Sequence, residues 1–200
     1  MKLYIATANA HKVEELRTLL AEALPNLQVL SGDKLGGMPH VDETATTFEG
    51  NALLKAEALH ALAPEGSWTL ADDSGLAIDA LNGAPGIFSA RHAGPDATDA
   101  DNRRKILAEL EGVPEQRRRA RFICALVLLG PSAQQHTFTG TCEGNITLEE
   151  QGSGGFGYDP LFKPTGYGET FGVLPSETKH ALSHRGRAIT ELASFLANIA

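Results

Sequence analysis

Two adjacent carboxylates, Asp72 and Asp73, follow a short apolar run, Trp68–Ala71, and precede Ser74 and Gly75. If the run forms a β-strand that continues into the pair, side-chain alternation sends the two carboxylates to opposite faces of the sheet. One carboxylate can then hold local structure while the other points towards a ligand. The oxygen-rich end of a strand suits a hard cation such as Mg²⁺. The alternative is an acidic surface turn, and only the motifs elsewhere in the chain weigh against it.

A polar connection, Thr7–Lys12, lies between an apolar run and a repeat of apolar residues at helical spacing. Ligands of α/β folds bind at the carboxyl ends of strands. A helix N-terminus at that edge offers amide N–H groups and the positive end of its dipole to a phosphate, and Lys12 adds a compact positive charge. The pattern favours phosphate binding, with a plain loop as the alternative.

The glycine-rich segment Gly152–Gly157 matches the pattern G-x-G-x-x-G. We predict no dinucleotide site there, because the segment leads into Tyr158-Asp159-Pro160 and a proline at that point does not continue a helix. We interpret the segment as a flexible loop that positions Phe156 and Asp159. An aromatic ring held by glycines is a suitable platform for stacking a base; a core aromatic is the alternative.

Basic residues gather before the last predicted helix, where His184 and Arg185 stand in Ser-His-Arg-Gly and Lys179 comes shortly before. A guanidinium can donate to O6 and N7 of a purine, and Lys179 could act similarly. An exposed turn is the alternative. In an irregular acidic segment, Asp42 or Glu43 could supply a second metal ligand, although acidic pairs of this kind are usually just solvated.

The elements that must position these residues alternate early in the chain and then become mainly extended. We expect an α/β protein with a mixed sheet, formed as one domain over residues 1–200. Strands are predicted at 3–6, 27–30, 68–73, 76–80, 120–129, 136–142 and 145–148, and helices at 13–23, 46–62, 99–110 and 186–199.

Composition limits the partners of the chain. The net charge of −8 argues against non-specific nucleic-acid binding, but not against a small polyanionic ligand. No apolar run approaches the roughly 20 residues that span a bilayer, so no membrane association is expected. Cys124 and Cys142 are far apart and are predicted to be buried free thiols of a cytoplasmic protein.

Taken together and in order, these motifs resemble the inosine triphosphate pyrophosphatase family over essentially the whole chain. The resemblance rests on Thr7-x-Asn9-x-x-Lys12, Thr47-Phe48-Glu49-Gly50-Asn51-Ala52-x-x-Lys55-Ala56, Ala71-Asp72-Asp73-Ser74-Gly75-Leu76, Gly83-Ala84-Pro85-Gly86-x-x-Ser89-Ala90-Arg91, Gly154-Gly155-Phe156-Gly157-Tyr158-Asp159-Pro160 and Ser183-His184-Arg185-Gly186.

The resemblance implies an elongated mixed β-sheet flanked by helices, with two lobes around a central cleft. It also implies a homodimer, dependence on Mg²⁺, and hydrolysis of ITP, dITP or XTP to the nucleoside monophosphate and pyrophosphate. Many relatives carry Glu where this chain has Gly50, which weakens any role for a carboxylate there and leaves Glu49 as the candidate in that turn.

Residue roles carried over from the family place Asp73 as the catalytic carboxylate and a metal ligand. The acidic ligand before the second helix maps to Asp42, with Glu43 as the alternative. The implied nucleotide-binding residues are Thr7, Ala8, Asn9, Ala10, His11, Lys12, Ser74, Phe156, Gly157, Tyr158, Asp159, Lys179, His184 and Arg185.

Two other readings of the sequence stay open at this point. One is a Maf-type pyrophosphatase acting on pyrimidine or modified triphosphates, which a comparison of ITP with UTP and dTTP would separate. The other is a catalytically silent nucleotide-binding protein, against which the intact Asp72-Asp73 pair and Lys12 argue.

Overall fold

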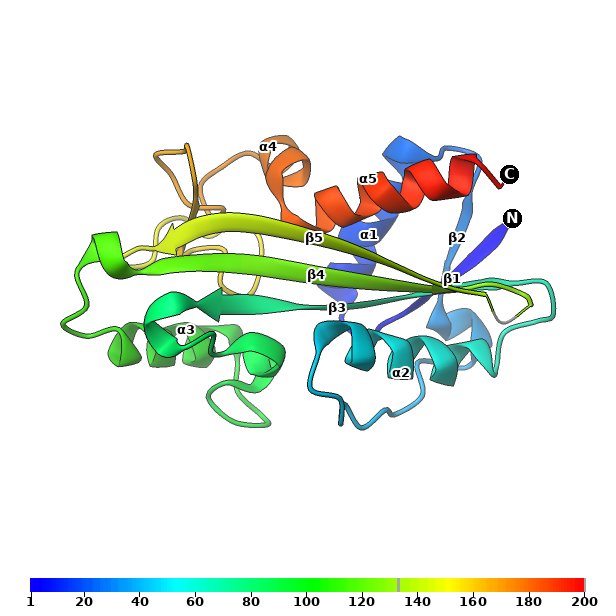
Figure 1. Ribbon diagram of the computed structural model, residues 1–200, viewed down its shortest axis with the longest axis horizontal. Coiled ribbons are helices and arrows are strands. Elements are labelled where there is room, and N and C mark those ends of the chain that lie inside the picture. The colour runs from blue at the N-terminus through cyan, green and yellow to red at the C-terminus, as the bar shows by residue number, and fades with distance from the viewer. Residues whose placement is uncertain (133, 200) are drawn as a thin grey trace. The chain divides into compact units, whose positions relative to one another are not determined.

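A six-stranded mixed sheet forms the framework of the computed structural model, which describes residues 1–132 and 134–199 (Figure 1). The strand order is β2-β1-β3-β4-β5-β6. Strand β1 pairs in parallel with β2 and β3, whereas β5 and β6 are antiparallel, so the predicted mixed α/β sheet is confirmed. The strands are β1 (Lys2–Ala6), β2 (Gln28–Ser31), β3 (Trp68–Ile78), β4 (Arg119–Leu129), β5 (Gln135–Ile146) and β6 (Phe162–Pro164).

The first three α-helices begin at capping residues that the sequence makes recognisable. Asn9 caps the first and Thr47 the second, while Thr98 and Asp101 form a capping box at the third. The second helix was predicted from residue 46, whereas Thr47 caps it and Phe48 is its first residue. The α-helices are α1 (Ala10–Ala23), α2 (Phe48–His60), α3 (Asp99–Glu109), α4 (Ser176–Leu182) and α5 (His184–Ala197).

Three details of the predicted strands were wrong. Strand β3 runs unbroken through Ser74 and Gly75, where we expected a break between two strands. Strand β5 likewise continues to Ile146 and absorbs the separate strand predicted at 145–148. The short elements β6 and α4 were not predicted, because three and seven residues are too few to show a periodic pattern.

By its internal contacts the described chain divides into two compact units. Unit 1 comprises Met1–Asp73, Cys124–Gly140 and Arg185–Ala200, and unit 2 comprises Ser74–Ile123 and Thr141–His184. The single domain and the cleft between two lobes stay predictions.

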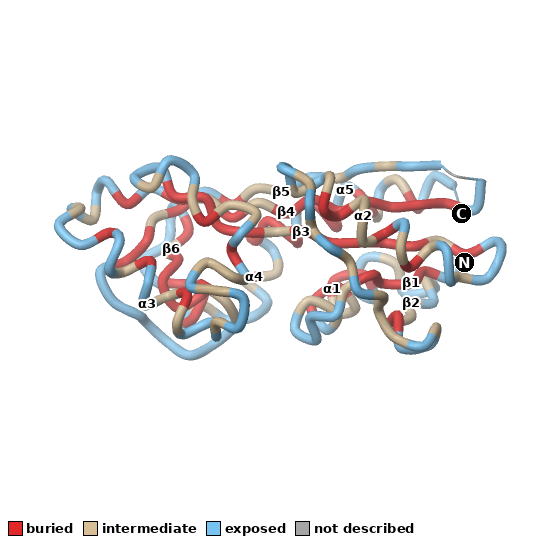
Figure 2. Tube along the Cα trace, turned by 90° about the horizontal axis from the view of Figure 1, so that it is seen from below, coloured by how far each residue is buried: buried red, intermediate tan, exposed pale blue. Residues whose placement is uncertain are grey.

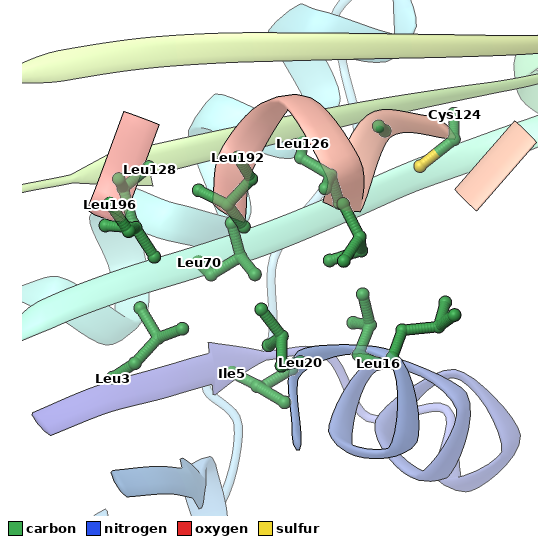
Figure 3. Close-up of a cluster of buried hydrophobic side chains, with 13 residues drawn as sticks. Leu3, Ile5, Leu16, Leu20, Leu70, Cys124, Leu126, Leu128, Leu192 and Leu196 are labelled. Atoms are coloured by element: carbon green, nitrogen blue, oxygen red, sulfur yellow. The ribbon is translucent and has the colours of Figure 1, made fainter. Parts of the chain in front are cut away.

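The core of unit 1 has two apolar clusters, set by the alternation of strand side chains, and Figure 3 shows one of them. Leu70 belongs to the cluster that includes residues of α1 and α5, such as Leu16 and Leu192. Its neighbour Ala71 belongs to the other, which includes Ala52 and Leu59 of α2. Successive residues of β3 thus face different helices, and this pattern sets the directions of the two carboxylates that follow.

Unit 2 has its own apolar cluster, in which residues of β3, α3, β4 and β5 meet aromatic residues from the later part of the chain. Phe122 packs against Phe162, with ring centroids 4.6 Å apart. Figure 2 shows buried residues concentrated along the strands and exposed ones in the connections. In the part of the chain that the structure describes, no helix has the length and apolarity needed to cross a membrane.

Candidate active site

Asp72 and Asp73 extend strand β3 past Leu70 and Ala71, and the alternation of the core continues into them. Asp72 shares the face of Leu70 and contacts Lys12 of α1 and Arg185 of α5. Asp73 shares the face of Ala71 and contacts Lys55 of α2. The predicted divergence of the two carboxylates is confirmed, and each has its own set of partners.

Asp72 is fully buried at the centre of a network of charged groups. Its Oδ1 accepts a hydrogen bond from Lys12 Nζ at 2.5 Å, and its Oδ2 accepts from Arg185 Nε at 2.9 Å. Burial would raise the pKa of Asp72, but the charges of Arg185 and Lys12 outweigh it and hold that pKa well below its usual value. Asp72 is therefore an ionised anchor for the two cations.

Two further groups complete this network. Arg185 Nη1 donates to Glu15 Oε2, which lies on the next turn of α1 after Lys12. Cys124 Sγ donates to Asp72 Oδ2 at 3.2 Å. Burial and the nearby Asp72 charge raise the pKa of Cys124 well above its usual value, so the thiol stays protonated and acts as a donor. The predicted buried free thiols at Cys124 and Cys142 are confirmed.

Asp73 has a different environment, with one oxygen paired and the other not. Lys55 Nζ donates to Asp73 Oδ1 at 2.7 Å and to Glu43 Oε1 at 3.2 Å. Asp73 Oδ2 is buried and has no hydrogen-bond partner among the described residues. Burial raises the pKa of Asp73, and the Lys55 ammonium offsets only part of that rise. A buried carboxylate oxygen left in this way is suited to accept a ligand or a proton.

These carboxylates fit Mg²⁺ as ligands. Mg²⁺ is usually bound through one or two carboxylates together with substrate phosphates and water. Asp73 and Glu43 meet at Lys55, so two acidic groups and one unpartnered buried oxygen lie at the same place. The described residues hold no group of three or more His, Cys, Asp or Glu side chains that could bind a metal without a substrate.

Of the two alternatives for a second metal ligand, the geometry favours Glu43. The Asp42 side chain is 84% exposed and its carboxylate contacts His40 at 3.2 Å. Glu43 is 24% exposed and shares the Lys55 ammonium with Asp73. The family resemblance placed Asp42 first and left Glu43 open, because the irregular segment has no periodicity that would show which of the two residues turns inward.

The first loop leads from β1 into α1 as predicted. Asn9 Oδ1 accepts from the Lys12 amide at 3.1 Å and caps the helix, while Thr7 Oγ1 accepts from the Asn9 amide at 3.2 Å. The other residues of this loop before Lys12, namely Ala8, Ala10 and His11, are exposed. The helix N-terminus therefore stays open to solvent next to a lysine that Asp72 holds in place.

The predicted base-binding residues of unit 2 form a second cluster. Lys179 Nζ lies 4.9 Å from the centroid of the Phe156 ring and donates to Asp159 Oδ2 at 2.8 Å. The same carboxylate oxygen accepts from the Phe156 amide at 2.8 Å. Asp159 and Lys179 are buried and Phe156 is half-buried. An aromatic face, a cation and a carboxylate are thus brought together around one loop.

Four further predicted residues lie in unit 2. His184 is buried and stacks on Phe122, with ring centroids 4.8 Å apart. Tyr158 is buried and donates to the Ser89 carbonyl at 2.8 Å. Ser74 continues β3 directly after Asp73, and Gly157 follows Phe156.

Arg185 has a setting that the sequence did not suggest. Its side chain is 2% exposed, and its Nε and Nη1 donate to Asp72 and Glu15. This arrangement gives Arg185 a supporting role towards Asp72, on the face of the sheet that packs against α1 and α5. That Arg185 or His184 contacts a purine base stays a prediction.

The list of predicted site residues omitted Glu15 and Lys55. Lys55 lies among the buried residues Asn51, Ala52, Ala56 and Leu59 of α2, so a charged residue at a core-facing helical position was a usable signal. Glu15 carried no such signal, because its partner Arg185 is 170 residues away in the sequence.

The two carboxylates lie within strand β3, whereas the sequence had suggested that they lie at its end. The fold and this site define an α/β protein with paired strand carboxylates, adjacent cations and an open helix N-terminus, a combination suited to phosphate chemistry. Comparison with known proteins is consistent with that class. The model of the Ham1 family matches residues 3–195. The chain therefore belongs to the Ham1 family.

Similar proteins match nearly end to end. The dITP/XTP pyrophosphatase of Opitutus terrae is 44% identical, with 98% of each chain covered. That of Yersinia pseudotuberculosis is 47% identical, with 94% of each chain covered. Among solved structures, the Ham1 protein of Staphylococcus aureus superimposes with a TM-score of 0.87 at 38% identity, covering 100% of both chains.

Proposed function

We propose that this protein hydrolyses the non-standard purine nucleoside triphosphates ITP, dITP and XTP to the nucleoside monophosphate and pyrophosphate. Relatives named dITP/XTP pyrophosphatase that match over nearly the full length support this assignment. The observation that carries the chemistry is the buried Asp73 Oδ2, which has no partner among the described residues and lies beside Lys55 and Glu43.

Asp73 is assigned the reacting role. Attack at the α-phosphorus requires a water molecule in line with the leaving pyrophosphate and a group that takes its proton. Asp73 Oδ2 is the acceptor available for this task, and burial raises the pKa of that carboxyl towards the range useful to a general base. Lys55 holds the other oxygen at 2.7 Å and so fixes the direction of Oδ2.

Asp73 and Glu43 are assigned as ligands of Mg²⁺, which would neutralise charge on the phosphates and polarise the reacting phosphoryl group. Burial alone would lower the pKa of Lys55, but Asp73 and Glu43 together raise it, so the ammonium stays protonated beside the two carboxylates.

The first loop of unit 1 is assigned to the phosphates. Lys12 carries one positive charge at the first turn of α1, where the amide groups of the helix N-terminus also favour an anion. Asp72 holds the Lys12 ammonium at 2.5 Å, which limits its freedom before a substrate arrives. Orienting a cation in advance reduces the entropy lost on binding.

The glycine-rich loop of unit 2 that carries Phe156 (residues 152–159), here called the aromatic loop, is assigned to the base. Phe156 offers a face for stacking, which is indifferent to the exocyclic group of the purine. Lys179 beside that ring is a donor suited to O6 of hypoxanthine or xanthine, where adenine presents an amino group instead. A site built to donate to a substrate oxygen rejects an analogue that lacks it.

The homodimer and the cytoplasmic location remain proposals that rest on the family resemblance. The net charge of −8 argues against a nucleic acid as the partner and is compatible with a small nucleotide.

The test is pyrophosphate release from ITP, dITP, XTP, GTP, ATP, UTP and dTTP, each with and without Mg²⁺. We expect the largest kcat/KM for ITP, dITP and XTP, and activity only with Mg²⁺. A preference for UTP or dTTP would indicate a Maf-type activity. No release from any triphosphate would leave a nucleotide-binding protein without catalysis.

A further inference from the structure

The peptide units around Gly157 are held from outside the aromatic loop by two charged side chains of α3. The Gly157 amide donates to Asp99 Oδ2 at 2.7 Å, and the Gly157 carbonyl accepts from Arg103 Nη1 at 2.8 Å. Asp99 and Arg103 stand four residues apart, so they lie on one face of the helix. Both hydrogen bonds involve a charged partner and are stronger than bonds between neutral groups.

We call the two hydrogen bonds from Asp99 and Arg103 to Gly157 the clamp. Gly157 is the residue at which this clamp has most influence on the conformation of the loop. It directly follows Phe156 and adopts φ +61°, a left-handed conformation that few residues other than glycine take up. A change at that residue would reorient the Phe156 ring. The backbone on the N-terminal side of Phe156 is held separately, because the Phe156 amide donates to Asp159 Oδ2.

Helix α3, which carries both residues of the clamp, is itself firmly held. Helix α3 starts at a capping box formed by Thr98 and Asp101, and it buries Asn102 and Ile106. Arg103 Nε also lies 3.0 Å from Glu150 Oε2, which orients the guanidinium before it reaches Gly157. The two hydrogen bonds thus join a packed helix to the glycine-rich loop.

We propose that Asp99 and Arg103 are positioning residues for the purine base, which act by holding Gly157 and thereby the stacking face of Phe156. This proposal rests on the proposed function and deepens it, because it names the residues that set how the base is bound. Asp99 is exposed and Arg103 half-buried, so their bonds add little to the stability of the whole protein. Their effect should therefore appear in base binding.

The first measurement is independent of activity. Amide hydrogen exchange is followed in the peptide covering residues 152–159 for the wild type, Asp99→Ala, Arg103→Met and Asp99→Asn. We expect faster exchange in Asp99→Ala and Arg103→Met, with recovery in Asp99→Asn, whose amide oxygen still accepts from Gly157. The matched controls are Asp96→Ala, which changes a nearby exposed carboxylate, and Arg104→Met, whose guanidinium contacts Asp101 instead.

The second measurement separates base binding from phosphate binding. In Asp99→Ala and Arg103→Met, KM for ITP and the inhibition constant of IMP should rise about five- to tenfold, a reduced effect because these bonds are partly exposed. The value of kcat and the inhibition constant of inorganic triphosphate should stay within about twofold, since the reacting groups lie elsewhere. Asp99→Asn should restore most of the IMP affinity.

Each outcome decides the matter. Unchanged exchange in Asp99→Ala and Arg103→Met would show that the clamp does not hold the loop. Faster exchange without a change in KM or IMP binding would show that the loop is held but does not position the base, and either result overturns the proposal. If the wild type cleaved no triphosphate, the proposed function would fail, whereas exchange and IMP binding would still report on the clamp.

Discussion

The charged cluster of unit 1 and the aromatic loop of unit 2 are positioned by different physical means. In unit 1, strand alternation and helix packing place buried charges, so that Asp72 meets Lys12 and Arg185. In unit 2, hydrogen bonds to the backbone place a glycine-rich loop, so that Phe156 is held through Asp159 and Gly157. The first arrangement depends on regular elements, and the second on local chain geometry.

This difference predicts different responses to substitution. A buried ion pair that loses one partner leaves an uncompensated charge in the core, which destabilises the whole fold. A loop that loses one backbone contact changes its own conformation at a small cost to the rest of the protein. Changes in unit 1 should therefore appear as loss of stability or turnover, and changes in unit 2 as weaker binding of the base.

The largest expected effect belongs to Asp72→Asn. The substitution removes the charge that Lys12 and Arg185 share, and breaking a buried pair costs about 3–5 kcal/mol. The free energy of unfolding by urea at neutral pH is the measurement. A loss below about 1 kcal/mol would contradict the view that Asp72 anchors unit 1.

The pH dependence of that loss gives a second check. The pKa of Asp72 is depressed in the folded state, so its stabilising contribution is complete above the unfolded-state pKa of about 3.9. The contribution is lost as the pH falls below that value towards the folded-state pKa. The difference in stability between wild type and Asp72→Asn should therefore be constant from about pH 5 to 8 and should shrink below about pH 4.

Asp73→Asn should affect turnover instead of folding. The variant keeps the size of the side chain but removes the proton acceptor and a charged metal ligand, so kcat for ITP should fall by about 10²-fold or more. Circular dichroism and the unfolding midpoint serve as controls for folding. Near-normal activity in a folded variant would overturn the catalytic assignment of Asp73.

A smaller effect, on the Mg²⁺ requirement, is expected from substituting Glu43, the second proposed metal ligand. Glu43→Gln should raise the Mg²⁺ concentration for half-maximal activity by about tenfold, a typical loss for weakening a metal site. Asp42→Asn is the matched control, because that side chain is 84% exposed and lies against His40. An effect at Asp42 and none at Glu43 would reverse the assignment.

In unit 1, the directions of the paired carboxylates could be predicted from the sequence for a physical reason. Alternation along β3 fixes the directions of Asp72 and Asp73 without knowledge of any other element. Helical spacing likewise places Lys55 on the buried face of α2. Such periodic rules hold wherever the element is regular, and they made the main strands and helices predictable.

Features that depend on distant contacts could not be predicted in the same way. The clamp between Asp99 and Gly157 joins residues 58 positions apart, and no local pattern marks either of them as a partner. Ser74-Gly75 has the composition of a turn, and it forms part of a strand because the neighbouring strands of the sheet override that preference. The choice of Glu43 over Asp42 similarly depends on the position of Lys55 in space.

In unit 2, Phe156→Ala should weaken every purine substrate to a similar extent. Stacking contributes about 1–3 kcal/mol per base and does not distinguish exocyclic groups, so KM should rise about tenfold for ITP, XTP and GTP alike. The unfolding midpoint should change little, because the ring is only half-buried. A loss confined to ITP would mean that Phe156 contributes to base selectivity, and a large loss of stability would make it a core residue.

The smallest effect, and the sharpest test of the contrast between the two units, comes from two glycines of the same loop. At Gly157 an added Cβ would meet no heavy atom within 4 Å, so Gly157→Ala costs only the strain of a left-handed backbone, about 1–2 kcal/mol. At Gly155 the added Cβ would come within 2.0 Å of Asp159 Oδ2, so Gly155→Ala must also displace the carboxylate that binds Lys179. Gly157→Ala should raise KM for ITP a few-fold and leave kcat unchanged, whereas Gly155→Ala should raise KM further. Equal KM values for the two variants and the wild type would show that the loop conformation does not govern binding of the base, and the distinction drawn between the two units would then be lost.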